Sequence, residues 1–374
     1  MSRQSSHNKT LHVLWLAPNF NHYKARFLNH LAEDKTVNLT ILSGTGRENM
    51  GDQEIEENWR FKHVKLDVSK RDFGKSQRVK QHLKRMFAEF DWILLPAEKK
   101  NLPLFLYVLK LRRQHSKVQL FSYNHAKLKS KQSLLSFLDR WLSKFFNKHL
   151  DRVIFYNENA CQQAVAQNLI SSEKAFWANN TVDDTEIAKH YQFELPPEKP
   201  LTLLFIGRLI ASKRISDAIV YFQALQEHFP QLQLEIIGDG PERSIVETAM
   251  ATNAHINWHG TLVDEADIAP IMKKATLVFV PGLSGLSINH AFAYGRPYIT
   301  LTADKHGPEL SYLDHGSNGY VLDDHLEKDV AKLASILKDR DQIVTLCNNA
   351  YDKGKMLSVE QWVKQLKSSL LYEG

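Results

Sequence analysis

The sequence predicts an α/β protein built from two Rossmann-like, doubly wound units. Throughout the 374 residues, apolar runs of strand length alternate with amphipathic segments of helix length. This alternation is typical of parallel sheets with helices on both faces. Residues 195–200 (LPPEKP) favour neither a helix nor a central strand, so they separate the chain into two halves.

Eleven strands are expected from the apolar runs. They cover 11–16, 37–42, 92–95, 118–122, 152–156 and 175–178 in the first half, and 201–206, 232–237, 256–259, 277–280 and 298–301 in the second. Residues 1–184 are predicted to form an N-terminal Rossmann-like domain, 185–200 a linker and 201–354 a C-terminal one. The amphipathic segment 355–374 is expected to pack back on the first domain.

Composition and cysteine content restrict the class of protein. With 43% hydrophobic and 24% charged residues, the chain has an ordinary globular composition. Cys161 and Cys347 lie far apart, so neither a disulfide framework nor a cysteine metal cluster is expected. No apolar run approaches the ~20 residues that span a bilayer, and 11–16 is too short for a signal-peptide core. A cytoplasmic protein is therefore expected.

Positive charge is concentrated in one part of the chain. Residues 62–149 contain 21 Lys and Arg against six acids, so they carry +15 while the remainder carries −9. Residues 133–149 place apolar side chains at helical spacing with lysines on other faces, and Lys127, Lys129 and Lys131 precede them. One interpretation is a core-facing helix with a solvated basic side. The other, which we favour, is contact with an anionic membrane surface. Nucleic acid is not expected as a partner, because no known binding module accompanies the charge.

Two motifs in the second half predict a pocket for an anion. Gly207, Arg208 and Lys213 follow the strand 201–206, at the carboxyl edge where open parallel sheets bind ligands. The glycine lets backbone approach a ligand, and the two cations can face one anion across a tight turn. For this motif alone, a solvated surface loop is the alternative.

The second motif follows the strand 277–280. Pro281 ends that strand, and Gly282 and Gly285 leave the backbone bare. A helix from about residue 287 to 294 is expected to direct backbone amides, including those of Gly285 and Leu286, toward the same crevice. A diphosphate ester is the biological anion that such a pocket suits.

Four ordered motifs between residues 201 and 339 resemble the donor-binding domain of glycosyltransferase family 4. In the GT-B fold of that family, two Rossmann-like domains face each other across a cleft. The motifs are Gly207-Arg208 with Lys213, the turn GDGP at 238–241, PGLSG at 281–285 and HAFAYGRP at 290–297. The resemblance implies a nucleotide-diphosphate sugar as donor, with Arg208 and Lys213 as catalytic cations. It places Gly207, Gly282, Gly285 and Leu286 at the donor site.

This chain departs from the family pattern at two positions. The family usually carries two glutamates eight residues apart, where this chain has Gly282 and His290. Gly282 offers no side chain, whereas the imidazole of His290 can hydrogen-bond a ribose hydroxyl. We expect Glu309, just beyond the next strand, to supply a compensating carboxylate at the donor site. Branches of the family that act in bacterial O-antigen and capsule assembly, close to lipopolysaccharide synthesis, look similar.

In the first half, two segments follow strands at the expected carboxyl edge. One contains His22, and the other contains Asn124 and His125. Family members often place a histidine after the second of these strands, so the resemblance implies a catalytic position near the donor sugar for His125. His22 and Asn124 are expected to bind the acceptor.

No metal site and no cofactor are expected; the donor itself, linked to UDP or GDP, is the nucleotide ligand. Asp339-Arg340-Asp341 has the D-x-D spelling of metal-dependent transferases of another fold, but the arginine between the acids favours a solvated surface. His255 and His259 are four apart in an expected strand, a spacing of ~13 Å along the chain.

The sequence thus predicts a glycosyltransferase that moves a sugar to a hydroxyl of a lipid-linked glycan in bacterial surface polysaccharide synthesis. The resemblance implies a retaining, metal-independent reaction by a peripheral protein at the inner face of the membrane. Two alternatives remain open. One is a non-catalytic nucleotide-binding partner, which the missing glutamates favour, and the other is a nucleotide-sugar epimerase of the same fold.

Overall fold

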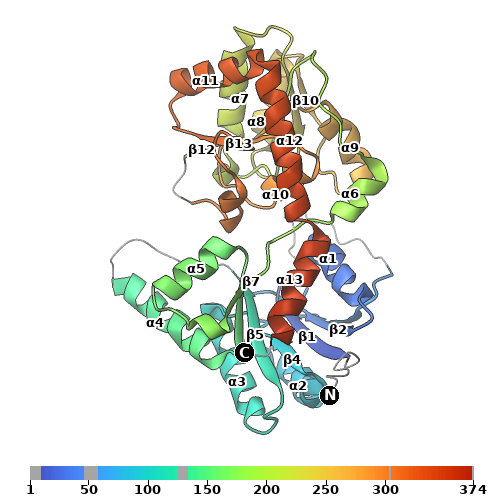
Figure 1. Cartoon of the computed structure of the whole chain (residues 1–374), viewed down its shortest axis with the longest axis vertical. Helices are drawn as coiled ribbons and strands as arrows, with labels where there is room; N and C mark the ends of the chain where they lie inside the picture. Colours follow the sequence, from blue (N-terminus) through green and yellow to red (C-terminus); the bar gives the residue numbers. More distant parts are fainter. Residues whose placement is uncertain (1–9, 46–57, 125–133, 303–304, 373–374) are drawn as a thin grey trace, which may run out of the picture. The chain divides into compact units, whose positions relative to one another are not determined.

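The chain forms two compact units, each built on one parallel sheet (Figure 1). The computed structural model describes residues 10–45, 58–124, 134–302 and 305–372. Among these, the first unit comprises the residues up to Asn179 and those from Glu360 onward, and the second comprises Asn180–Val359. None of the helices in the described ranges is long and apolar enough to cross a membrane.

The first unit contains a seven-stranded sheet in the order β3-β2-β1-β4-β5-β6-β7. Its strands are β1 (Leu11–Ala17), β2 (Val37–Ser43), β3 (Lys62–Lys65), β4 (Trp92–Leu94), β5 (Gln119–Asn124), β6 (Arg152–Phe155) and β7 (Ala175–Trp177). Its helices are α1 (His22–Glu33), α2 (Gln77–Met86), α3 (Leu102–Arg112), α4 (Leu134–His149), α5 (Glu158–Ala166) and α13 (Val359–Leu371), with short 3-10 turns η1 (Phe87–Glu89), η2 (Lys99–Asn101) and η3 (Ser172–Lys174).

The second unit contains a six-stranded sheet in the order β10-β9-β8-β11-β12-β13. Its strands are β8 (Thr202–Ile206), β9 (Gln233–Ile237), β10 (Ile256–Trp258), β11 (Leu277–Phe279), β12 (Tyr298–Leu301) and β13 (Gly319–Leu322). Its helices are α6 (Asp184–His190), α7 (Ile215–Gln226), α8 (Arg243–Thr252), α9 (Glu265–Lys274), α10 (Ser287–Ala293), α11 (Leu326–Lys338) and α12 (Arg340–Met356), with turns η4 (Ala211–Lys213) and η5 (Pro308–Tyr312).

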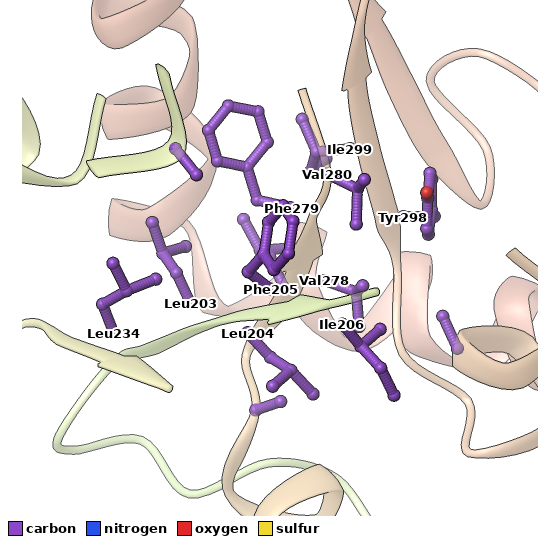
Figure 2. Close-up of a cluster of buried hydrophobic side chains, with 14 of the residues drawn as sticks. Leu203, Leu204, Phe205, Ile206, Leu234, Val278, Phe279, Val280, Tyr298 and Ile299 are labelled. Carbon is purple, nitrogen blue, oxygen red and sulfur yellow. The ribbon is translucent and has the colours of Figure 1, made fainter. Parts of the chain in front are cut away.

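Strands β8 and β11 form the centre of the second core. Every residue of β8 and of β11 is buried, because helices cover both faces of a parallel sheet. Figure 2 shows side chains of β8, β9, β11 and β12 gathered there, including Phe205 and Phe279, which are 0% and 1% exposed. This core holds the carboxyl ends of β8 and β11 in place, and the two predicted anion-binding motifs start from those ends.

The last helix, α13, belongs to the first unit although it is the final element of the chain. Figure 1 shows it in red beside α1 and the strands of that unit. Trp362 is fully buried and packs on the rings of Phe27 and Tyr123, at centroid distances of 4.8 and 6.2 Å. The segment 355–374 was expected to pack back on the first domain. From Glu360 onward it belongs to the first unit, whereas residues 355–359 belong to the second.

The boundary between the units differs from the predicted linker. Residues 185–200 lie within the second unit, because α6 and the segment after it pack on α9 and the end of α10. Tyr191 is 8% exposed, and its hydroxyl donates to the Tyr294 carbonyl and accepts from Arg296 at 3.2 and 3.0 Å. The chain crosses between the units at Asn179 and again at Val359.

All eleven predicted strands are present within one or two residues at their ends, but two further strands were not predicted. β3 is a polar edge strand, and three of its four residues are exposed. β13 is an edge strand of four residues that follows a turn. Short edge strands carry weak apolar patterns, so their pairing is decided by the neighbouring strand.

Candidate functional site

The second sheet reverses its strand order between β8 and β11. In open α/β sheets, ligands bind beyond the carboxyl ends of the strands at such a reversal. Here the 207–214 loop follows β8 and the 281–286 loop follows β11, so both predicted motifs lie at this point. The fold therefore brings together the elements that the sequence motifs assigned to one anion site.

Two backbone hydrogen bonds join these loops. The N–H of Gly282 donates to the carbonyl of Lys213 at 3.2 Å, and that of Leu283 donates to the carbonyl of Ser212 at 2.7 Å. A Cβ added to Gly282 would lie 2.2 Å from the Ser212 carbonyl oxygen. The close approach leaves no room at position 282 for the glutamate of the family pattern. Glycine is required here to connect the loops.

Lys213 lies over the backbone of Gly207. A Cβ added to Gly207 would lie 3.4 Å from Cε and 3.7 Å from Nζ of Lys213. No hydrogen bond or ion pair within the described residues engages the ammonium group. Burial, with a contribution from the positive charge of Arg208, lowers the pKa of Lys213 to about 8, while Glu309 opposes the shift. A desolvated ammonium beside a second cation is a site prepared for an anion.

The 281–286 loop also contains backbone amides without a hydrogen-bond acceptor in the described residues. In the part of the chain that the structure describes, neither Gly285 nor Leu286 donates its N–H to a hydrogen bond. No heavy atom lies within 4 Å of a Cβ added to Gly285, so space is open beside it. α10 begins at Ser287, and its two preceding amides are thus available to an oxygen ligand.

Glu309 is buried in η5 and lies near these groups. It is 5% exposed, and its Oε1 accepts a hydrogen bond from Nδ2 of Asn180 at 2.6 Å. Its Oε2 has no partner among the described residues and would lie 2.4 Å from a Cβ added to Gly307, which itself would be 3.4 Å from Cα of Gly285. One oxygen of this carboxylate is therefore anchored, and the other lies on the side of Gly285.

A histidine positions the loop that carries Glu309. Nδ1 of His306 accepts from the N–H of Ser284 at 3.3 Å, and Nε2 donates to the carbonyl of Leu301 at 3.0 Å. Burial lowers the pKa of His306, and the charge of Lys213 lowers it further. His306 is therefore a neutral imidazole that fixes residues 306–309 against the 281–286 loop.

His290 is paired with a carboxylate that the sequence analysis missed. His290 and Glu265 are 8% and 7% exposed, and Nε2 of His290 lies 3.1 Å from the carboxylate. The hydroxyl of Tyr294 donates to the same carboxylate at 2.7 Å. Glu265 is the first residue of α9 and lies 25 positions before His290, so only its acidic character at a helix start was visible in the sequence.

The first unit contains the remaining predicted site residues. His22 is the first residue of α1, and Asn124 is the last residue of β5 and is half-buried. His125 lies outside the described residues, as do Lys127, Lys129 and Lys131. The roles assigned to these residues stay predictions.

Metal ligands are not grouped in the described residues, where no cluster of three His, Cys, Asp or Glu side chains has the geometry to hold an ion. Asp339 of the D-x-D sequence caps α12, because its Oδ1 accepts from the N–H of Gln342 at 2.9 Å. His259 pairs with Glu235 at 2.5 Å rather than with His255.

Residues 186–355 match the family model of glycosyl transferases group 1. The match covers nearly all of the second unit and includes the 207–214 and 281–286 loops, His290 and Glu309. No curated protein matches the sequence. The second unit is therefore a glycosyltransferase domain, and the prediction that the chain is a glycosyltransferase enzyme is confirmed.

Solved structures resemble the whole chain. HepE from Anabaena in complex with UDP has 17% identity and a TM-score of 0.69, over 96% of this chain and 99% of that one. Sucrose-phosphate synthase from Thermosynechococcus elongatus has 15% identity and a TM-score of 0.69, over 96% and 98%. The lipopolysaccharide outer core galactosyltransferase WaaB has 15% identity and a TM-score of 0.66, over 96% and 99%. The two parallel sheets and these likenesses confirm the predicted GT-B fold.

The affinity for UDP should depend on pH through Lys213. The pKa of its ammonium is about 8 in the unliganded protein, and an anion binds the protonated form. Affinity is expected to be level below pH 8 and to fall by up to about tenfold per pH unit above it. Calorimetric titration with UDP from about pH 7 to 9.5 would measure this, with Lys213→Arg as the control that stays charged. A parallel decline in both proteins would contradict the assignment.

The junction between the loops should tolerate no side chain at Gly282. Gly282→Ala places a methyl group against the Ser212 carbonyl, so we expect a loss of about 1–3 kcal/mol in the free energy of unfolding. Gly285→Ala is the matched control, because open space surrounds that position, and its effect should stay within about 0.5 kcal/mol. Urea denaturation measures the free energy of unfolding of the two variants. Equal losses would show that the backbone at position 282 can move apart to accept a methyl group without destabilising the protein.

Proposed function

We propose that this protein transfers a sugar from a nucleotide diphosphate donor to a hydroxyl of a lipid-linked glycan acceptor. The observation that carries the proposal is the unpaired, desolvated ammonium of Lys213 beside Arg208 at the reversal of the second sheet. Such a pair is unfavourable in an empty site and becomes favourable when a diphosphate binds.

The cations act on the leaving group. As the bond between the sugar C1 and the diphosphate oxygen breaks, negative charge grows on the diphosphate. Arg208, Lys213 and the amides of Gly285 and Leu286 stabilise this charge without reorganising water. These protein groups supply the positive charge, so the proposed reaction needs no divalent ion.

The proton of the acceptor hydroxyl moves to the departing diphosphate. The new bond forms between the acceptor oxygen and C1 on the face that the diphosphate leaves, so the configuration at C1 is retained. This step balances without a separate base, and the retention rests on the resemblance to glycosyltransferase family 4.

Glu309 is proposed to bind a hydroxyl of the donor sugar. A buried carboxylate close to a diphosphate would weaken binding of that anion, unless the carboxylate accepts hydrogen bonds from the ligand. Asn180 holds Oε1, and Oε2 remains for the sugar. In this proposal Glu309 supplies the carboxylate that the family pattern has at position 282, where this chain has glycine.

His290 is proposed to bind a ribose hydroxyl. Since the Glu265 carboxylate accepts only, Nε2 of His290 carries the proton shared with it. The neutral imidazole then has Nδ1 as an acceptor for a hydroxyl. Glu265 therefore fixes the tautomer of the residue that replaces the second family glutamate.

The structural neighbours guide the choice of donor and acceptor. The HepE structure contains UDP, and WaaB is a galactosyltransferase of the lipopolysaccharide outer core. We therefore propose a UDP-linked sugar as the first donor to test, with GDP-linked sugars as the comparison, and a bacterial surface glycan as the acceptor.

The first unit is proposed to contact an anionic membrane surface, so that the enzyme acts as a peripheral protein at the inner face of the cell membrane. α3 and α4 pack through Phe105 on Phe146, at a centroid distance of 4.7 Å. This helix layer exposes Trp141 by 59% and Leu106 by 49%, next to exposed cations. Lys110, Lys144 and Lys148 are among those cations. Exposed aromatic and aliphatic side chains among lysines suit the headgroup region of a bilayer.

Turnover should depend on the two cations. Arg208→Ala and Lys213→Ala are each expected to reduce turnover by ~10² or more, because each removes charge that meets the developing diphosphate. Release of UDP from a panel of UDP-sugars measures this. Wild-type protein that binds UDP but releases none from any donor would support the non-catalytic alternative.

Glu309→Gln separates the sugar contact from the diphosphate contact in the same assays. The variant should bind UDP at least as tightly as wild type, since a negative charge near the diphosphate is lost, but should turn over UDP-sugars more slowly. Weaker UDP binding together with normal turnover would reverse the assigned roles of Glu309 and Lys213.

Sedimentation with vesicles tests the membrane contact. Lys144→Glu/Lys148→Glu should reduce co-sedimentation with phosphatidylglycerol vesicles, by roughly 1 kcal/mol of binding free energy per charge removed from the surface. Lys274→Glu/Lys338→Glu, which changes the same charge on exposed sites of the second unit, is the control. Equal loss in both variants would reject α4 as the contact.

A further inference from the structure

The first sheet has its own reversal of strand order, between β1 and β4. The rule that places ligands beyond the carboxyl ends at such a reversal applies to it equally. Segments 18–21 and 95–101 follow these two strands, and the 66–76 segment follows β3 nearby. None of these segments contains a residue assigned above to the donor.

Two carboxamides at this edge have unpaired atoms within the described part of the chain. Asn101, which follows β4, is 1% exposed, and neither its Oδ1 nor its Nδ2 has a hydrogen-bond partner there. Asn19, which follows β1, has a buried Oδ1 that likewise lacks one. Buried carboxamides are normally paired, so each unpaired atom indicates a missing partner.

Asn101 also departs from the usual behaviour of its position. It is the N-cap residue of α3, a helix of 11 residues, yet its side chain makes no capping bond. Asparagine is favoured at this position because it caps the first turn. Its carboxamide instead lies against Gly74, since a Cβ added there would be 3.0 Å from Oδ1.

Close backbone contacts join the loops at this edge of the sheet. A Cβ added to Gly44 would lie 2.4 Å from the Val68 carbonyl and 3.3 Å from that of Pro18. One added to Gly74 would lie 3.0 Å from the Lys100 carbonyl. The loops after β1, β2, β3 and β4 therefore touch one another, and Phe73, which is fully buried, anchors the third of them.

Cations are frequent in two of these loops. Segments 69–75 and 98–101 contain five Lys and Arg against two acids, Asp72 and Glu98. Lys100 pairs with Glu98 at 2.5 Å, and Asp72 bonds to Ser69. Within the described residues, no hydrogen bond or ion pair engages the side chains of the exposed cations Arg71, Lys75 and Lys99.

We propose that this edge binds a phosphate or diphosphate group of the acceptor, through Lys75, Lys99 and the carboxamide of Asn101. The inference rests on the proposed function, because it describes the second substrate of a transferase. Ammonium groups attract the phosphate, and the unpaired N–H group of the Asn101 carboxamide would add a directional hydrogen bond that surface lysines lack. The acceptor is then a phosphorylated carrier whose charged link lies at the first unit.

The chemistry favours a phosphate over a neutral sugar. A neutral glycan would gain no electrostatic attraction from these cations, whereas a phosphate would. It also favours a discrete substrate group over a lipid surface, because Asn101 is 1% exposed and a flat membrane reaches only exposed side chains.

Geranyl diphosphate is a suitable soluble probe, with the donor site saturated by UDP so that Arg208 and Lys213 are already occupied. We expect calorimetry to show binding of geranyl diphosphate and none of geraniol at the same concentration. Lys75→Glu/Lys99→Glu should weaken this binding by about tenfold or more. Lys84→Glu/Arg85→Glu on α2, an equal change at exposed sites, should alter it less than about twofold. The variants' affinity for UDP, measured separately, reports whether the donor site and the fold are intact.

Asn101→Asp is a second variant that keeps the size of the side chain and adds negative charge. It should abolish binding of geranyl diphosphate while UDP affinity stays within about twofold. Equal losses in the two double variants, or equal binding of geranyl diphosphate and geraniol, would overturn the proposal. Binding to phosphatidylglycerol vesicles, sensitive to Lys75 and Lys99, without binding of the soluble diphosphate would also overturn it in favour of a lipid headgroup. If the wild-type protein did not bind UDP, that result would instead count against the proposed function itself.

Discussion

The close contact between Gly282 and the backbone of Ser212 and Lys213 is the constraint on which the donor site depends. Two hydrogen bonds from the 281–286 loop fix these carbonyls, and the contact is possible because position 282 has no side chain. It holds the turn that carries Lys213 against the loop in which the amides of Gly285 and Leu286 have no hydrogen-bond acceptor among the described residues. Glycine at position 282 is thus a structural requirement here, and we propose that Glu309 supplies the carboxylate that position 282 cannot carry.

Buried ionisable side chains surround this contact. Lys213 has lost hydration without gaining a partner among the described residues, whereas the carboxylates of Glu309 and Glu265 accept hydrogen bonds from neighbouring side chains. Glu309 is held by Asn180, and Glu265 is held by Tyr294 and His290. Buried groups of this kind are unfavourable for stability alone, and this supports the proposal that a charged ligand binds at the reversal of the sheet. The first sheet repeats the arrangement with unpaired carboxamides and cations at its own reversal.

Much of the fold could be predicted because parallel sheets need continuous apolar strands. The runs at 11–16 and 201–206 are buried on both faces, so their composition alone identified them. β3 could not be found in this way, since its exposed lysines resemble a loop. The interval 185–200 was predicted as a linker from its prolines, but Tyr191 and Arg296 anchor it to the second unit. Prolines show where a helix or strand ends, but they do not show where a domain ends.

The sequence by itself determined the two-unit α/β architecture, because strand composition is a local property. It also predicted an anion site from the local motif of Gly207, Arg208 and Lys213. It could not show which side chains pair with the carboxylates near that predicted site. Glu265 and His290 lie on different helices, and Glu309 and Asn180 are 129 residues apart, so only the folded chain brings each pair within hydrogen-bond distance. Tertiary structure also decided that the Lys213 ammonium is desolvated, since burial depends on the packing of loops after separate strands.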